Sequence, residues 1–218
     1  MAQQLDGPRW GPASGGAAKQ LVVLLHGLGA DGMDLIDLAP SWGEVVPDAA
    51  FVAPDAPFPC DLAPYGKQWF SVQDRTPARI MAGVAAAMPA LDGFLDAELA
   101  RLGLPGSALA IMGFSQGAMM TLAVGLRRAV APAALLAFSG RLAMPLPDSL
   151  PGAPPVLLVH GMADEVVPVS GSREAEAALR AKGVAVRAIY SPGLGHGIDE
   201  AGLIGGAQAL EQAFSAPG

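Results

Sequence analysis

The sequence predicts an α/β fold, a mostly parallel, doubly wound sheet with helices on both faces. Short, uniformly apolar segments such as residues 21–25 (LVVLL) and 108–112 (ALAIM) lack polar alternation, which is typical of strands buried on both faces of a parallel sheet. Helical segments alternate with these strands along the chain, as in βαβ units. No repeat, linker or low-complexity segment interrupts this order, so we expect one domain over residues 1–218.

The sequence of the first third of the chain predicts one helix between two strands, with irregular segments on either side. Residues 1–18 are rich in Gly, Ala and Pro, and we expect a loose N-terminal arm there. A strand over 21–25, a helix over 34–42 and a strand over 50–53 follow. Residues 54–77 are rich in proline and show little periodicity, and so long an irregular segment in a compact domain is usually functional. We expect this loop near the functional site.

The remaining two thirds repeat the alternation of helix and strand. The expected helices cover residues 78–102, 118–124, 172–182 and 204–214, and the expected strands cover 108–112, 133–138, 156–159 and 184–190.

Composition and charge exclude several classes of protein. A hydrophobic content of 52% with only 15% charged residues excludes disorder. Thirteen basic against 20 acidic residues give a net charge of −7, which argues against nucleic acid and anionic membranes as partners. The single cysteine, Cys60, excludes an internal disulfide. The N-terminus does not read as a secretory signal, and no apolar run reaches the ~18 residues of a membrane span, so we expect a cytoplasmic protein.

The segment Gly113-Phe114-Ser115-Gln116-Gly117 lies between a predicted buried strand and a predicted helix. A strand, G-x-S-x-G and a helix form the context of a nucleophile elbow. The tight turn lifts the serine hydroxyl above the sheet, and the chain packs so closely on both sides that glycine is needed there. The alternative is a glycine-rich turn with a surface serine, and the flanking elements favour the elbow.

Further candidates follow other predicted strands. Ligands of open α/β sheets bind at the carboxyl ends of the strands, where Ser115, Asp164 and His196 are all expected. Ser, Asp and His in that chain order are typical of α/β-hydrolases. The chemistry needs these three types, because a serine requires a base to take its proton and the base requires a carboxylate to orient it.

Alternatives exist for the base and the acid. His26 and His160 also follow strands, and we expect His26 to brace its loop and His160 to support the acid loop. Glu165 and Asp199 compete with Asp164, although Asp199 also suits a helix N-cap.

An oxyanion hole requires two preorganised N–H donors. The backbone N–H of Gln116, directly after the serine, offers one, and the His26-Gly27-Leu28 loop offers the second, which we assign to Leu28.

Metal and dinucleotide sites are not expected. The three histidines show no metal-ligand spacing, and the glycines of residues 27–32 do not fit G-x-G-x-x-G. The following apolar side chains are candidates for an acyl pocket, although core packing is an alternative role for each: Met33, Trp69, Phe70, Met119 and Val167.

Six segments resemble the phospholipase/carboxylesterase family of α/β-hydrolases, relatives of the acyl-protein thioesterases. They are LLHGLGADG (24–32), PDAP (54–57), QWF (68–70), GFSQG (113–117), HGMADEVVP (160–168) and GLGHGI (193–198). The resemblance implies Ser115, Asp164 and His196 as the triad and Leu28 and Gln116 as the oxyanion hole. It also implies cofactor-free hydrolysis of carboxylic esters, with thioesters and lysophospholipids as further candidates, by a monomer or homodimer.

The sequence therefore supports two hypotheses. The first is a serine carboxylesterase that forms an acyl-enzyme, and the apolar composition of residues 54–77 favours uncharged, short to medium acyl chains. The second is a non-catalytic α/β-hydrolase that binds a small apolar ligand, since the fold alone does not define the activity. A complete triad favours the enzyme, because a binding protein has no need of all three groups.

Overall fold

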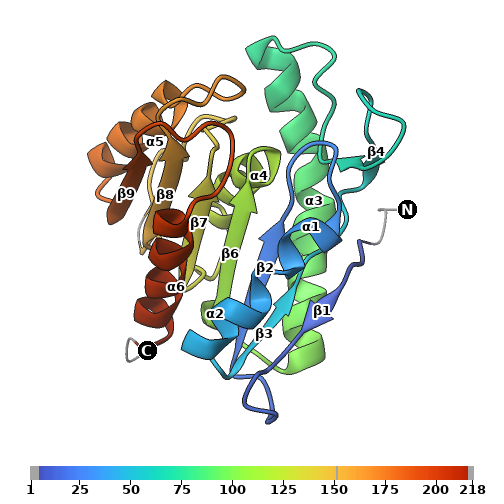
Figure 1. Cartoon of the computed structure of the whole chain (residues 1–218), viewed down its shortest axis with the longest axis vertical. Coiled ribbons are helices and arrows are strands. Elements are labelled where there is room, and N and C mark those ends of the chain that lie inside the picture. Colours follow the sequence, from blue (N-terminus) through green and yellow to red (C-terminus); the bar gives the residue numbers. More distant parts are fainter. Residues whose placement is uncertain (1–4, 151, 216–218) are drawn as a thin grey trace.

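The computed structural model describes residues 5–150 and 152–215. Seven strands in these residues form one sheet in the order β1-β3-β2-β6-β7-β8-β9 (Figure 1). β1 pairs with β3 in antiparallel fashion, and all other neighbours are parallel. The expected α/β class with a mostly parallel sheet is thereby confirmed. The strands are β1 (Arg9–Trp10), β2 (Gln20–Leu25), β3 (Ala49–Val52), β6 (Leu109–Phe114), β7 (Ala134–Phe138), β8 (Val156–Gly161) and β9 (Val186–Ser191).

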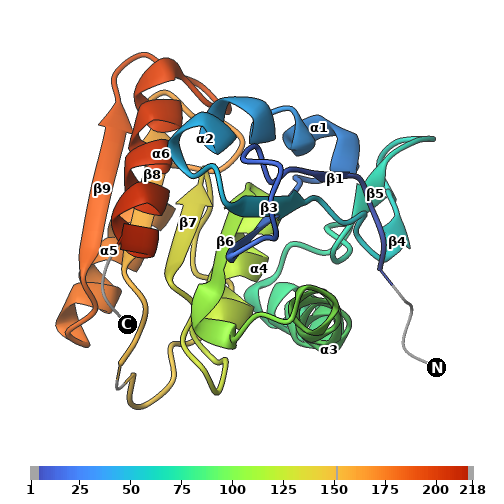
Figure 2. The ribbon, with the colours of Figure 1, turned by 90° about the horizontal axis from the view of Figure 1, so that it is seen from below.

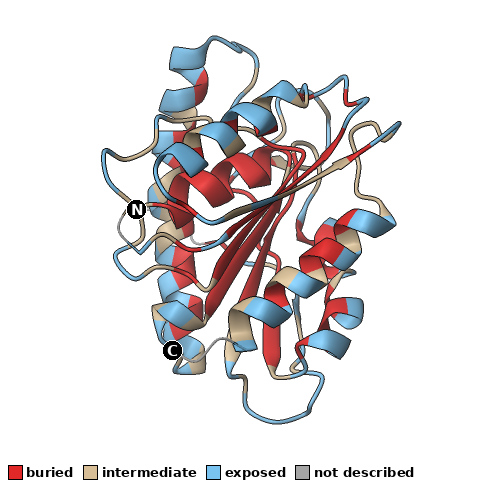
Figure 3. Cartoon of the chain, turned by 90° about the vertical axis from the view of Figure 1, so that its left-hand side faces the viewer, coloured by how far each residue is buried: buried red, intermediate tan, exposed pale blue. Residues whose placement is uncertain are grey.

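Helices cover both faces of the sheet (Figure 2). One face carries α1 (Gly32–Ile36), α2 (Ala39–Val45) and α6 (Glu200–Ser215), and the other carries α3 (Pro77–Leu102), α4 (Gln116–Gly125) and α5 (Ser170–Ala181). A 3₁₀ turn, η1 (Gly106–Ala108), precedes β6. Successive residues of a strand point to opposite faces, so Val23 packs in one core and Val22 in the other. The inner strands β2, β3, β6, β7 and β8 are buried along almost their whole length, whereas the edge strands β1 and β9 are partly exposed (Figure 3). Helix α4 is buried on all sides, and the other helices bury mainly the side that faces the sheet.

The N-terminal segment is more ordered than expected. Residues 1–4 lie outside the described residues, but Arg9–Trp10 form β1 at the edge of the sheet. The Trp10 ring packs edge-on against Phe51, with centroids 5.8 Å apart. Arg9 Nη2 donates to Glu98 Oε1 on α3 over 2.6 Å. These contacts tie the segment down, so the expectation of a loose arm is wrong for this part of the chain.

Two other segments differ from expectation. The single helix expected over residues 34–42 is two helices, because Pro40 in the first turn of α2 has no N–H to continue the hydrogen bonds of α1. The irregular segment 54–77 contains a short hairpin, in which β4 (Phe58–Pro59) pairs with β5 (Lys67–Gln68).

Helix α3 runs from Pro77 to Leu102 and includes Pro89. By length and composition it is apolar enough to cross a membrane. One side of it is buried against the sheet and α4, in a stripe at helical spacing that includes Ile80, Val84, Leu91 and Leu95. This packing explains its apolar composition as that of a core helix.

The sheet reverses its strand order between β2 and β6. The chain winds outward from β2 to β3, then returns to β6 and winds the other way to β9. The carboxyl ends at such a switch point form the usual ligand crevice of an open α/β sheet. The hairpin and the start of α3 rise beside this edge, the upper one in Figure 1.

Candidate active site

Ser115 occupies a strained turn between β6 and α4. Its φ of 54° and ψ of −113° lie outside the regions that non-glycine residues usually adopt. A Cβ at Gly113 would lie 2.2 Å from the carbonyl oxygen of Gly117, and one at Gly117 would lie 1.9 Å from that of Leu25. Both positions therefore require glycine, and the segment has the geometry of an elbow.

The structure brings Ser115, His196 and Asp164 together in one hydrogen-bonded chain. His196 Nδ1 lies 2.6 Å from Asp164 Oδ2, and His196 Nε2 lies 3.0 Å from Ser115 Oγ. A carboxylate only accepts, so Nδ1 carries the proton and Nε2 is free to accept from the serine hydroxyl. The ring of Phe114 packs 4.9 Å from that of His196 and supports its orientation.

Asp164 is buried and held as an anion. The backbone N–H groups of Val166 and Val167 donate to its Oδ1 over 2.8 and 2.9 Å. Burial alone would raise the pKa of Asp164, but the hydrogen bonds from His196 and from these N–H groups outweigh it and hold the pKa below its usual value. The carboxylate is thus ionised at neutral pH and suited to stabilise a cation on His196.

The other two histidines make no hydrogen bond to Ser115 among the described residues. His26 is fully buried, and its Nε2 accepts from the N–H of Ala56 over 2.9 Å. Its Nδ1 therefore carries the proton and donates to the Gly27 carbonyl over 2.7 Å. Burial lowers the pKa of His26, which keeps it neutral. His26 thus joins its own loop to residue 56.

His160 lies directly behind Asp164. Its Nε2 faces the carbonyl of Val167 at 2.8 Å and Asp164 Oδ2 at 3.2 Å, and its Nδ1 contacts Ser172 Oγ at 2.7 Å. It therefore holds the acid loop against α5.

The two rival acids lie in different surroundings. Asp199 Oδ1 accepts from the N–H of Gly202 over 2.9 Å at the start of α6. The polar groups of Ser191 and Gly202 beside it hold the pKa of Asp199 below its usual value. Glu165 is exposed. Neither makes a hydrogen bond to His196 among the described residues, whereas Asp164 does.

The cavity beside Ser115 is lined by two residues whose backbone N–H groups are unpaired among the described residues. Leu28 and Gln116 line that cavity, and neither N–H has an acceptor within the residues that the structure describes. A Cβ built on Gly27 would lie 3.4 Å from Ser115 Cβ, so this loop lies close to the serine. The Gln116 side chain accepts from the N–H of Trp69 and donates to the carbonyl of Phe70, over 2.8 and 2.7 Å. This clamp joins the elbow to segment 54–77.

The cavity that contains Ser115 has a volume of about 310 Å³. Phe70, Met119 and Val167 line it, as expected of pocket residues. Trp69 does not, because it is fully buried and its Nε1 donates to the carbonyl of His26 over 3.0 Å, so that expectation is wrong. Met33 is 61% exposed and lies outside the cavity as well.

Other residues of the cavity wall escaped the reasoning from sequence. They are Val72, Arg75, Ile80, Arg141, Val166 and Pro168. A position directly after β7 is the one signal that could have pointed to Arg141, because the ends of neighbouring strands share one edge. Across residues 5–150 and 152–215, no group of three or more His, Cys, Asp or Glu side chains is arranged to hold a metal ion.

Comparisons with known proteins show which family the chain belongs to. The model of the Phospholipase/Carboxylesterase family matches residues 13–210. The chain is 33% identical to Esterase YpfH of Escherichia coli over 84% of this chain and 78% of that protein. It is 30% identical to Acyl-protein thioesterase 1 of Schizosaccharomyces pombe over 67% of this chain and 69% of that protein.

A solved structure is also similar. The crystal structure of esterase PE8 superposes with a TM-score of 0.89 at 43% identity, over 96% of this chain and 99% of that chain. The resemblance expected from the sequence is thereby confirmed. The chain belongs to the phospholipase/carboxylesterase family of α/β-hydrolases and is a carboxylic ester hydrolase.

Proposed function

We propose that the chain is a serine carboxylesterase in which Ser115 is the nucleophile, His196 the general base and Asp164 the orienting acid. The observation that carries this proposal is the continuous chain from Ser115 Oγ through the imidazole to Asp164, with distances of 3.0 and 2.6 Å. An imidazole so placed can take the hydroxyl proton as attack occurs.

The reaction has two halves. Ser115 Oγ attacks the acyl carbonyl while its proton moves to His196 Nε2, and the N–H groups of Leu28 and Gln116 stabilise the oxyanion. His196 then gives this proton to the leaving alcohol, and an acyl-enzyme remains. Water attacks that ester with His196 again as base, and the acid leaves as Ser115 regains its proton.

The cavity favours short to medium acyl chains. Its volume of about 310 Å³ is at the small end for ligand sites, and Phe70, Met119 and Val167 give it apolar walls. Thioesters and lysophospholipids with such chains present the same carbonyl to Ser115. One relative bears the name Acyl-protein thioesterase 1, which supports including thioesters.

Hydrolysis of p-nitrophenyl acetate and butyrate by the wild type and by Ser115→Ala tests the proposal. We expect turnover by the wild type and a loss of several orders of magnitude in the variant. Ser139→Ala is the matched control, since Ser139 is also buried at a strand end with a positive φ but does not line the cavity. Equal turnover by wild type and Ser115→Ala would overturn the assignment. No turnover by either would favour the alternative of a binding protein.

A further inference from the structure

Two arginines line the cavity beside Ser115, and the proposed mechanism uses neither. Arg75 lies just before α3, and Arg141 lies just after β7. The other side chains of this wall are mostly apolar, and no acidic side chain lines the cavity among the residues that the structure describes. Both arginines therefore border the space where an ester substrate would lie.

These two arginines differ from all the others. Within residues 5–150 and 152–215, Arg75 and Arg141 form no hydrogen bond, ion pair or ring contact with another side chain or with the backbone. Every other arginine is engaged. Ion pairs hold Arg9, Arg79, Arg101, Arg128 and Arg180, oxygen acceptors bind Arg127 and Arg187, and Arg173 lies over the ring of Tyr190. An acidic protein of net charge −7 thus leaves its two unpartnered arginines in one cavity.

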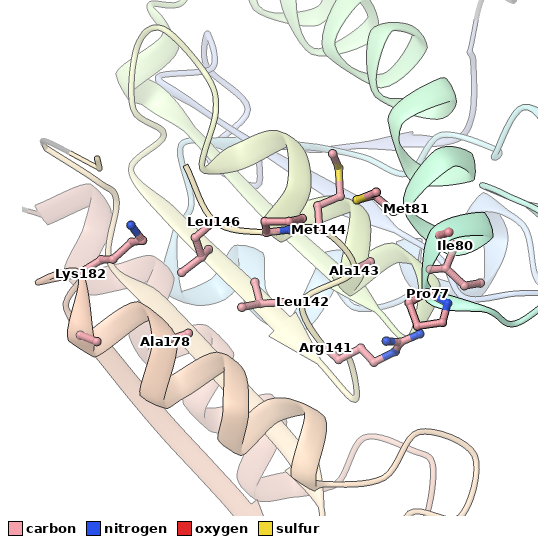
Figure 4. A pocket seen from close by; sticks show the side chains of 13 residues that line it. Pro77, Ile80, Met81, Arg141, Leu142, Ala143, Met144, Leu146, Ala178 and Lys182 are labelled. Carbon is pink, nitrogen blue, oxygen red and sulfur yellow. The ribbon is translucent and has the colours of Figure 1, made fainter. Parts of the chain in front are cut away.

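The stem of Arg141 is held by packing. A Cβ built on Gly171, in the first turn of α5, would lie 2.8 Å from Arg141 Cβ and 3.5 Å from its Cδ. Figure 4 shows the side chain directed toward Pro77 at the start of α3. Arg141 and Ile80 line both the Ser115 cavity and the neighbouring groove of about 900 Å³. Arg141 therefore lies at the boundary between these two spaces.

We propose that Arg75 and Arg141 bind an anionic group of the ester substrate, a carboxylate on its acyl part or a phosphate on its alcohol part. The inference rests on the proposed esterase activity and specifies its substrate class. A guanidinium matches both groups with two parallel N–H donors, and such charge-assisted hydrogen bonds are among the strongest in proteins. An anionic ester gains these contacts, whereas a neutral ester leaves both cations without a partner.

Two matched pairs of esters test this substrate class. Monomethyl adipate beside methyl hexanoate places the charge on the acyl part, and 1-butyrylglycerol 3-phosphate beside 1-butyrylglycerol places it on the alcohol part. We expect the anionic member of one pair to have a kcat/KM about tenfold higher, through a lower KM, with the preference weakened by salt. The pair that shows the preference identifies the source of the charge.

Variants connect the preference to the arginines. Arg75→Gln with Arg141→Gln abolishes the preference for the anionic ester, whereas Arg79→Gln, which breaks an ion pair with Asp74 outside the cavity, retains it. Equal kcat/KM within both pairs, or a preference that survives the double variant, would overturn the inference. If the wild type hydrolyses the neutral esters and Ser115→Ala does not, the proposed esterase function stands, whether or not the arginines select anionic esters.

A binding measurement decides the inference even without turnover. Ser115→Ala, titrated calorimetrically, should bind monomethyl adipate or 1-butyrylglycerol 3-phosphate about tenfold more tightly than the neutral partner. Equal affinities within both pairs would contradict the proposed anion site.

Discussion

The two walls of the Ser115 cavity are built in different ways. The reactive wall comprises Ser115 together with the strand-end residues that hold the reactive groups in place. Gly117 packs on the carbonyl of Leu25, and Asp164 accepts from two N–H groups and an imidazole. A second wall, called the opposite wall below, includes Arg75 and Arg141 from segments outside the regular elements, and neither arginine has a partner among the described residues.

This difference separates two tasks. Groups that transfer protons and stabilise charge must be placed within a few tenths of an ångström, and a rigid sheet edge provides that precision. Groups that select a substrate need a suitable shape and charge, and flexible side chains on loops can supply both. We therefore expect changes at the reactive wall to abolish the rate, and changes at the opposite wall to alter which ester is preferred.

The largest effect is expected at His196. His196→Ala removes the base, so we expect kcat for p-nitrophenyl butyrate to fall by about 10⁴- to 10⁶-fold, with little change in KM. The double variant with Ser115→Ala should be no slower than either single variant, because the two groups act as one unit. If His196→Ala keeps a tenth of the wild-type activity, His196 is not the general base and the assignment of the reactive wall is wrong.

A slightly smaller loss is expected at the acid. Asp164→Asn removes the charge that orients His196 and stabilises its cation, and kcat should fall by about 10³- to 10⁴-fold. Asp199→Asn is the control, since Asp199 accepts from the N–H of Gly202 at the start of α6. That change should lower the free energy of unfolding by less than about 1 kcal/mol and leave kcat unaltered. The reverse pattern would make Asp199 the acid.

The rigidity of the reactive wall can be tested by adding one methyl group. At Gly117 a Cβ would lie 1.9 Å from the Leu25 carbonyl oxygen, so Gly117→Ala should lower the free energy of unfolding by about 3 kcal/mol and abolish activity. Gly93, in helix α3, has nothing within 4 Å of an added Cβ, so Gly93→Ala should stabilise the protein by about 0.5–1 kcal/mol. Urea unfolding of both variants measures the contrast. Similar stabilities would contradict the close packing at the elbow.

The smallest effect on catalysis is expected at Glu98, outside both walls. Burial alone would raise the pKa of Glu98, but its hydrogen bonds from Arg9 and Arg101 outweigh it and lower the pKa. When the pKa of a carboxyl is lower in the folded than in the unfolded protein, its ionised form stabilises the fold. This stabilisation is present at a pH above the unfolded-state pKa of about 4.3 and is lost as the pH falls through the folded-state pKa.

Glu98→Gln should therefore lose about 1–2 kcal/mol of stability at pH 7 without a change in kcat. The difference from the wild type should shrink as pH falls below about 4, in urea unfolding at several pH values. The exposed Glu174→Gln is the control and should show no such pattern. A difference that is independent of pH would contradict the ion-pair account.

The reactive wall could be predicted from sequence because each of its groups follows a strand within a few residues. Ser115 and His196 are also flanked by glycines, and all parallel strands end at one edge, so local patterns define this geometry. The opposite wall depends on contacts between distant residues. Trp69 is a large apolar side chain of the kind that lines pockets. However, its hydrogen bond to the His26 carbonyl, 43 residues away in the sequence, holds it outside the cavity.

Arg75 and Arg141 show the same limit. Apart from the position of Arg141 shortly after β7, they resemble other surface charges in the sequence, and the absence of a partner in space distinguishes both from the other arginines. β1 escaped prediction for a related reason, since a strand of two residues shows no periodicity and exists here through its pairing with β3 and the ion pair of Arg9 with Glu98. Most of the secondary structure and the reactive groups thus follow from local patterns, whereas the two-residue strand β1 and the opposite wall do not.

Labelling with a fluorophosphonate, followed by peptide mass spectrometry, tests the central claim most directly. The reagent phosphonylates a serine only where a base and an oxyanion hole activate it. We predict one adduct per chain, on Ser115, that fails to form in His196→Ala and forms normally in Ser139→Ala. An adduct on a different residue, or an enzyme that hydrolyses esters and remains unlabelled at Ser115, would contradict the account.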